Sequence, residues 1–190
     1  MGSYTIVSDI GNMIIGLLKE EMVPEIIASA DAIGMCSPAE KENVSLGLYL
    51  YDVRESESVR VNGMQSDGLS RQKYPPMYLD LYYMLTAYSM SDAKFRSSEE
   101  QRILGRVMQI LHDHPSISPE TMTFGASPFG ETIRIEMMQI NTEEKVKLWN
   151  NPNTAYRLSV FYKVSPVLLE STRSVATARV TALDFTVDES

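Results

Sequence analysis

The run 75–88 constrains the fold more than any other part of this chain. It opens with two prolines and then alternates as a β-strand does, yet large apolar side chains fall on both faces. One face would carry Met77, Leu79, Leu81, Tyr83, Leu85 and Ala87, and the other Tyr78, Tyr82, Met84, Thr86 and Tyr88, with Asp80 the only charge. A strand with one face in water alternates apolar with polar residues. The pattern therefore predicts a sheet that packs its own helices on one side and meets another chain or segment on the other.

A second strand with the same character is expected over residues 44–54. Val44, Leu46, Leu48 and Leu50 would share one face, and Gly47, Tyr49, Tyr51 and Val53 the other. Tyrosine suits a contact surface because its ring is apolar and its hydroxyl prefers a wet rim or a hydrogen-bond partner. We take five tyrosines as candidates for an interface: Tyr49, Tyr51, Tyr78, Tyr82 and Tyr88. Cover by helices of the same subunit explains them equally well.

Helical periodicity and capping signals place three helices. Residues 5–22 repeat apolar side chains every three or four positions, and Pro24 ends the pattern. Ser97-Ser98-Glu99-Glu100 is typical of a helix start, with Pro115 closing that helix. A short helix follows over 141–149, and its Trp149 is interpreted as a core anchor.

The remaining segments are assigned by composition and alternation. Residues 55–74 are polar and longer than the roughly 12–15 residues usual for a structureless loop, so we expect them to be mobile or ordered by a partner. The other expected segments are a strand or helix continuation at 25–35, a loop at 115–130, and strands at 132–140, 154–169 (bending at Pro166) and 177–187. The fold class is then α+β: a mainly antiparallel sheet with three helices packed on it. Residues 1–190 form one domain, with 171–190 a possible terminal strand and acidic tail.

Charge and cysteine content exclude several function classes. A net charge of −8 without a cluster of Lys and Arg disfavours nucleic acid and anionic lipid. The apolar stretches are too short for a membrane span, and the N-terminus lacks the basic region of a signal peptide. The single cysteine, Cys36, rules out an internal disulfide and fits a reducing compartment. We expect synthesis in the cytosol.

No segment matches a catalytic, cofactor-binding or metal-binding motif, so we expect no enzyme, no cofactor and no metal. His112 and His114 are two apart and cannot form the i, i+4 pair of a helical zinc site. Cys36 has no base at catalytic spacing and is interpreted as a small packed residue. The stretch 125–130 has a proline after its serine, unlike a serine elbow. Solvation explains the acid pairs Glu20-Glu21, Glu99-Glu100 and Glu143-Glu144.

Five segments in order resemble a known family. They are 46–55 (LGLYLYDVRE), 75–88 (PPMYLDLYYMLTAY), 100–114 with its RILGRVMQILHDH, 133–140, and Leu148-Trp149 leading into 156–167 (YRLSVFYKVSPV). The chain resembles the tail-terminator or cap proteins of contractile injection systems, phage-tail-like particles that drive an inner tube through a contracting sheath. The likeness covers about residues 5–170.

The resemblance implies a structural cap rather than a catalyst. Such a subunit assembles as a hexameric ring on the membrane-distal end of the inner tube, stops tube and sheath polymerisation, and links the last sheath layer to the tube. Its partners would be further copies of itself, the tube protein and the sheath protein. It would be made in the bacterial cytoplasm, for a particle that is cytosolic, released or membrane-anchored. Two alternatives stay open: a phage head-to-tail joining protein, and a small enzyme with an unrecognised site.

Overall fold

The computed structural model describes residues 4–40, 43–68, 70–117, 132–149 and 155–176. Within them the chain forms three α-helices: α1 (Ile6–Met22), α2 (Ala93–Asp113) and α3 (Thr142–Leu148). A short 3₁₀ turn, η1, spans Ala30–Ala32. The strands are β1 (Ile33–Met35), β2 (Leu46–Glu55), β3 (Gln65–Ser66), β4 (Arg71–Lys73), β5 (Met77–Ala87), β6 (Ser116–Ile117), β7 (Ile133–Met138), β8 (Ser159–Leu169) and β9 (Ser174–Ala176).

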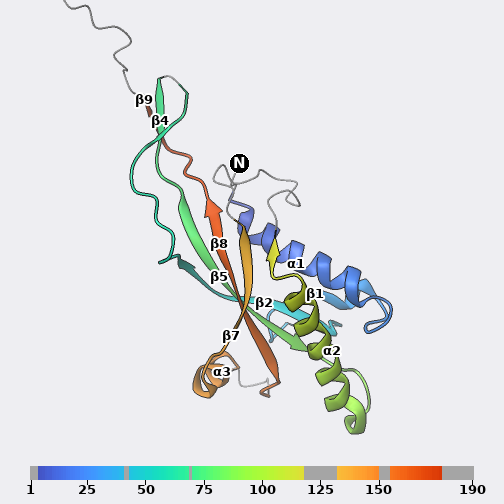
Figure 1. Cartoon of the computed structure of the whole chain (residues 1–190). Coiled ribbons are helices and arrows are strands. Elements are labelled where there is room, and N and C mark those ends of the chain that lie inside the picture. The colour runs from blue at the N-terminus through green and yellow to red at the C-terminus, as the bar shows by residue number, and fades with distance from the viewer. Residues whose placement is uncertain (1–3, 41–42, 69, 118–131, 150–154, 177–190) are drawn as a thin grey trace, which may run out of the picture.

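A twisted sheet in the order β1-β2-β5-β8-β7-β6 forms the body of the molecule (Figure 1). All its neighbours are antiparallel except β1 and β2, which run parallel. β5 lies at the centre between β2 and β8, which explains why the run 77–87 is buried along almost its whole length. The α+β class with a mainly antiparallel sheet is confirmed.

Helices α1 and α2 cover one face of this sheet, called here the helix face. α1 buries Ile10, Leu18 and Met22 completely, and α2 buries the stripe that includes Ile103 and Val107. These side chains form one apolar cluster with five of the residues that the alternation predicted for this face: Leu79, Leu81, Tyr83, Leu85 and Ala87. Burying such aliphatic side chains contributes about 1.5–3 kcal/mol each and stabilises the sheet against its helices.

The opposite face, called here the tyrosine face, has a smaller core of its own. Met84, Tyr88, Trp149 and Phe161 are buried together there, with Tyr49 and Tyr51 partly buried against them. Trp149 follows directly after the short helix α3, which brings it onto this face. The expectation that Trp149 anchors a core is confirmed.

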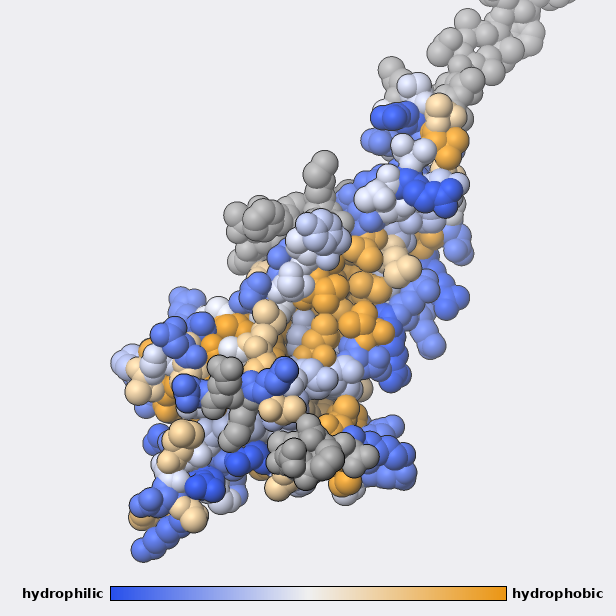
Figure 2. Space-filling view, turned by 180° about the vertical axis from the view of Figure 1, so that it is seen from behind, coloured by the Kyte–Doolittle hydropathy of each residue, from blue (hydrophilic) through white to orange (hydrophobic). Residues whose placement is uncertain are grey.

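A bulge in β2 changes which face its last residues occupy. Leu50 pairs with Tyr83, but after the bulge Asp52 pairs with Tyr82 and Val53 with Leu81. Placing Val53 on the same face as Tyr51 was therefore wrong: the extra residue moves Val53 to the helix face. Exposed apolar side chains in this part of the sheet include Val53 and Met77, 43% and 45% exposed. Figure 2 shows apolar surface gathered in the middle of the molecule and bordered by hydrophilic residues.

A narrow arm extends from one end of the body (Figure 1). In the arm, β4 pairs with both β3 and β9 to form a second, three-stranded sheet. Since β4 precedes β5 and β9 follows β8 in the sequence, the arm extends these two central strands beyond the main sheet. The described part of 55–74 is therefore partly ordered by the chain's own β9. These short strands were not predicted, because strands of two or three residues show no alternation of apolar and polar side chains.

Other boundaries also differ from the expectation. α2 begins at Ala93, four residues before the expected serines, with Asp92 as its N-cap residue. Residues 155–158 precede β8 without joining it, and Ser116-Ile117 form a strand inside the expected loop. The expected terminal strand 177–187 and most of the loop 115–130 lie outside the described residues.

Candidate interaction surface on the tyrosine face

The five candidate tyrosines separate into two groups by burial. Tyr78, Tyr82 and Tyr88 are between 2% and 9% exposed, so the subunit itself covers them. Tyr49 and Tyr51 are only half-buried and keep part of their rings accessible. The face thus consists of a buried aromatic floor with two tyrosines above it at the end nearer α3.

Ring packing holds this floor in place. Tyr51 lies edge-on to Phe161, with ring centroids 5.8 Å apart, and tilted against Tyr82 at 6.2 Å. Such aromatic pairs contribute about 0.5–1.5 kcal/mol beyond their buried area. Burial raises the pKa of the Tyr51 hydroxyl above its ordinary value, with the nearby Asp52 acting in the same direction. The Tyr51 hydroxyl is therefore protonated and neutral at physiological pH.

A groove of about 500 Å³ opens beside Tyr51. β2 and β5 supply one wall, and the other comes from the end of β7 with α3. Its lining residues are Tyr51, Asp52, Arg54, Tyr82, Met138, Gln139, Ile140, Glu144, Lys147 and Leu148. Arg54 binds Asp52 at 2.7 Å, and its guanidinium lies 4.9 Å from the centre of the Tyr82 ring. An apolar floor with charged groups at the rim is the composition of a protein contact surface.

An ion pair lies next to this floor in the middle of the sheet. Lys163 Nζ is 2.7 Å from Asp80 Oδ2, and Asp80 is 5% exposed. The hydrogen bond to Asp80 raises the pKa of the Lys163 amine and keeps it charged. Among the described residues the other oxygen, Asp80 Oδ1, has no hydrogen-bond partner. The pair neutralises the only charge in β5 and positions no reactive group.

The histidines and the cysteine considered above as candidates for chemistry lie in no catalytic or metal-binding arrangement within the described residues. His112 and His114 are exposed at the end of α2. Burial, together with Glu40, raises the pKa of the Cys36 thiol, which disfavours the nucleophilic thiolate. No group of three or more metal-ligating side chains occurs within the described ranges. Of the helices described, none is long and apolar enough to cross a membrane.

Both members of the acid pair Glu99-Glu100 do more than solvation would require. Glu100 accepts a hydrogen bond from Arg157 at 2.5 Å, joining α2 to the residues before β8. Glu99 accepts hydrogen bonds from the hydroxyls of Ser89 and Ser91, and these hydrogen bonds lower the pKa of its carboxyl. The expectation of purely solvated carboxylates was wrong at these positions, because the chain folds back on α2 at both.

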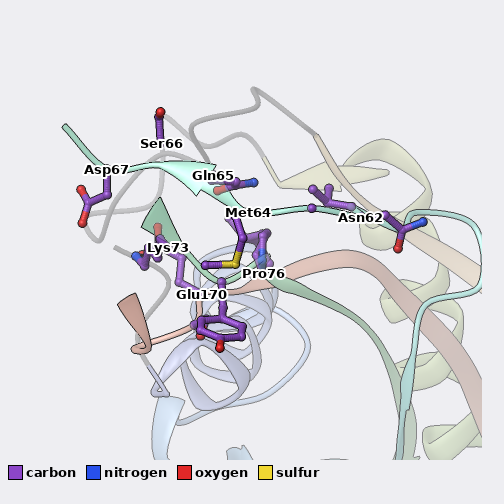
Figure 3. Close-up of a pocket in the computed structure, with 13 residues that line it drawn as sticks. Asn62, Met64, Gln65, Ser66, Asp67, Lys73, Pro76 and Glu170 are labelled. Carbon is purple, nitrogen blue, oxygen red and sulfur yellow. The ribbon is translucent and has the colours of Figure 1, made fainter. Parts of the chain in front are cut away.

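A second pocket, of about 600 Å³, lies at the base of the arm. In Figure 3, Met64 lies next to Pro76 inside it, while Ser66 and Asp67 point outward. Lys73 and Glu170, which line the pocket, bind each other at 2.7 Å and tie β4 to the segment after β8. This pocket was not predicted, because its walls come from two segments about a hundred residues apart in sequence.

Comparisons with known proteins agree with this fold. Residues 9–182 match the model of the family described as the Pvc16 N-terminal domain. The solved sheath/tube terminator of an extracellular contractile injection system, PVC, in its extended state, superposes with a TM-score of 0.67 at 14% identity. That match covers 100% of this chain and 65% of the terminator. No curated protein matches the sequence.

A second solved structure gives the same result. The tube-terminating cap of the anti-feeding prophage superposes with a TM-score of 0.66 at 18% identity, over 95% of this chain and 61% of the cap. This chain thus spans under two thirds of the length of both solved proteins. Because the family model covers nearly all of it, the chain belongs to the Pvc16 N-terminal domain family, with the fold of contractile-injection-system terminators.

Proposed function

We propose that this chain is a structural cap of a contractile injection system. It assembles as a hexameric ring on the membrane-distal end of the inner tube, ends tube and sheath polymerisation, and links the last sheath layer to the tube. The observation that carries the proposal is the family match over residues 9–182, together with the fold shared with a sheath/tube terminator and a tube-terminating cap. The action is binding rather than catalysis.

The tyrosine face supports a contact role within such a particle. Tyr49 and Tyr51 remain half-buried above a floor that the subunit already fills, and the groove beside Tyr51 has an apolar floor with a charged rim. We assign this face to a neighbouring protein of the particle, the tube or the sheath. Their own subunit buries Tyr78, Tyr82 and Tyr88, so we assign the contact mainly to Tyr49 and Tyr51, with Tyr82 reached only where it lines the groove.

Electron microscopy of particles from cells that lack this protein tests the proposal. A cap that stops growth predicts tubes of unregulated length or sheaths that fail to stay attached, and restoring the gene corrects both. Particles of normal length with attached sheaths would overturn the cap function. Co-purification of the intact protein with tube and sheath proteins is the matching biochemical measurement.

A further inference from the structure

We propose that neighbouring copies of this chain are joined by strand addition, in which residues 177–187 of one copy pair with an unpaired edge of β2 in the next. The inference rests on the ring assembly proposed above and adds which two surfaces meet. Residues 177–187, the terminal strand expected from the sequence, are called here the donor segment. They lie outside the described residues, so their part in the contact is inferred from their sequence and from where β9 leads.

The acceptor is the side of β2 that faces away from β5. On that side β1 pairs only with residues 46–48, and the Cys36 N–H donates to the carbonyl of Leu48 at 3.1 Å. β2 continues to Glu55, paired with β5 on its other side. Within the described ranges no strand lies beside residues 50–55, called here the open edge. Such an edge presents N–H and C=O groups to which an extended segment can add as a further strand.

Apolar side chains flank the open edge on both faces of the sheet. Val53 is 43% exposed on the helix face, where Leu50 is partly buried. Tyr51 is half-buried on the tyrosine face. The bulge in β2 and the ion pair of Asp52 with Arg54 are features that discourage unspecific pairing at a sheet edge. We therefore expect the added strand to depend on side-chain contacts as well as on the backbone ladder.

The donor segment has the composition of a strand with apolar side chains on both faces. By alternation, Leu183, Phe185 and Val187 would share one face, and Val180 would lie on the other with smaller side chains. β-Branched and aromatic residues favour strands, and the segment contains neither Pro nor Gly. Its two faces thus match the two apolar sides of the open edge.

The arm of the same copy offers the donor segment no further partner. β9 leads away from the body of the molecule (Figure 1), and its Ala176 pairs with Arg71, the first residue of β4. Before Arg71 the chain turns at Gly68, whose φ is +77°, and the Asp67 N–H donates to the carbonyl of Arg71. A strand that continues past Ala176 therefore runs beyond the end of β4.

Distance favours the open edge of a neighbouring copy over that of the same copy. From Arg71, opposite Ala176, the chain runs to Leu79, opposite Glu55, which is about 26 Å at roughly 3.3 Å per residue. Returning over that distance would use about eight residues and leave only those from about 185 onward to pair. The whole donor segment can pair only with a second copy. Such a contact is heterologous, and repeated contacts of that type close into a ring when the rotation allows.

Proline substitution in the full-length chain tests the contact. Ring formation is measured by native mass spectrometry and light scattering for the wild type and for Ala182→Pro/Leu183→Pro. One of these two neighbouring amides must face the acceptor, and proline has no N–H to donate, so we expect association to weaken roughly tenfold or more. The matched control is Ala182→Val/Leu183→Ile, which keeps a strand-forming sequence and should assemble as the wild type does.

A peptide of residues 177–190 gives an independent measurement. Fluorescence anisotropy follows its binding to the full-length Ala182→Pro/Leu183→Pro variant, whose own donor segment is disabled. We expect saturable binding that Val53→Lys weakens roughly tenfold. Phe95→Lys, which makes the same kind of change at an exposed apolar residue of α2, should alter binding little. Absence of binding, or equal effects of the two lysines, would overturn the strand addition.

Cross-linking separates contacts between copies from contacts within one copy. In a Cys36→Ser background, Val53→Cys and Leu183→Cys place one thiol at the open edge and one in the donor segment. A short bismaleimide should give a ladder of covalent oligomers up to the closed ring, whereas either single cysteine should give none beyond a dimer. Cross-links confined to the monomer would overturn the pairing between copies.

The outcomes also separate this inference from the cap function. A ring that tolerates Ala182→Pro/Leu183→Pro overturns the strand addition and leaves the cap function standing. A wild-type chain that stays monomeric in solution and at tube ends overturns the ring and this contact together.

Discussion

Removing the amine of Lys163 should destabilise this protein far more than removing an exposed lysine. Lys163 Nζ lies 2.7 Å from Asp80 Oδ2, and the Asp80 side chain is 7% exposed, in the middle of the central strand. For charge centres about 4 Å apart, an effective dielectric of 20 gives an attraction of about 4 kcal/mol. Loss of one partner of a buried pair costs about 3–5 kcal/mol, because the other charge stays buried. Since the Lys163 side chain is 26% exposed, we expect about 3 kcal/mol for Lys163→Met.

Urea unfolding of the isolated subunit measures this directly. Asp80→Asn/Lys163→Met should lose much less, about 1 kcal/mol, because no unpaired charge remains. The control is Lys147→Met, which removes an exposed pair with Glu143 and should change the free energy of unfolding by less than about 0.5 kcal/mol. If Lys163→Met behaves like Lys147→Met, or if the double variant is the least stable of the three, the reasoning about the buried charge is wrong.

Three further predictions concern the tyrosine face. Gly47→Ala should destabilise by about 1–3 kcal/mol in urea unfolding, since a Cβ there would lie 2.7 Å from the sulfur of Cys36 and 3.2 Å from the ring of Tyr88; an unchanged midpoint would contradict this packing. Burial raises the pKa of the Tyr88 hydroxyl to about 12, whereas an unfolded tyrosine ionises near 10. The unfolded chain then loses its proton first, so the free energy of unfolding should fall as pH rises from 10 towards 12, and less so in Tyr88→Phe; identical pH profiles would refute this. Asn141→Ala removes the side-chain oxygen that accepts the Glu144 N–H hydrogen bond at 2.8 Å and caps α3. It should lower the free energy of unfolding by about 1 kcal/mol and change the fluorescence of Trp149, the only tryptophan. An unaltered spectrum would argue against a link between this cap and the position of Trp149.

The sequence predicted the centre of the fold because its alternation there is long and strict. β5 and the first half of β2 occupy the expected positions, with Leu81 on the helix face and Met84 on the tyrosine face. The pattern failed where a local irregularity intervenes. The bulge at Tyr51 places Val53 on the helix face, and the residue types around that position do not predict a bulge.

The contact surfaces were harder to predict than the strands. Alternation identified a face rich in tyrosine, but it could not say how much of each ring the subunit covers. The Tyr82 ring lies beneath Tyr51 and Arg54 of the neighbouring strand, whereas Tyr51 is only half-buried against Phe161, which lies about a hundred residues away in sequence. The arm depends on similar long-range pairing, so no local pattern predicts it.

Cryo-electron microscopy of growing tubes tests the capping role most directly. Purified inner-tube protein is allowed to polymerise with and without this protein, and tube lengths and end densities are compared. The account predicts a ring of this chain at one end of each tube and an arrest of elongation at that end. Tubes that continue to lengthen at both ends, with no added density at either, would contradict it.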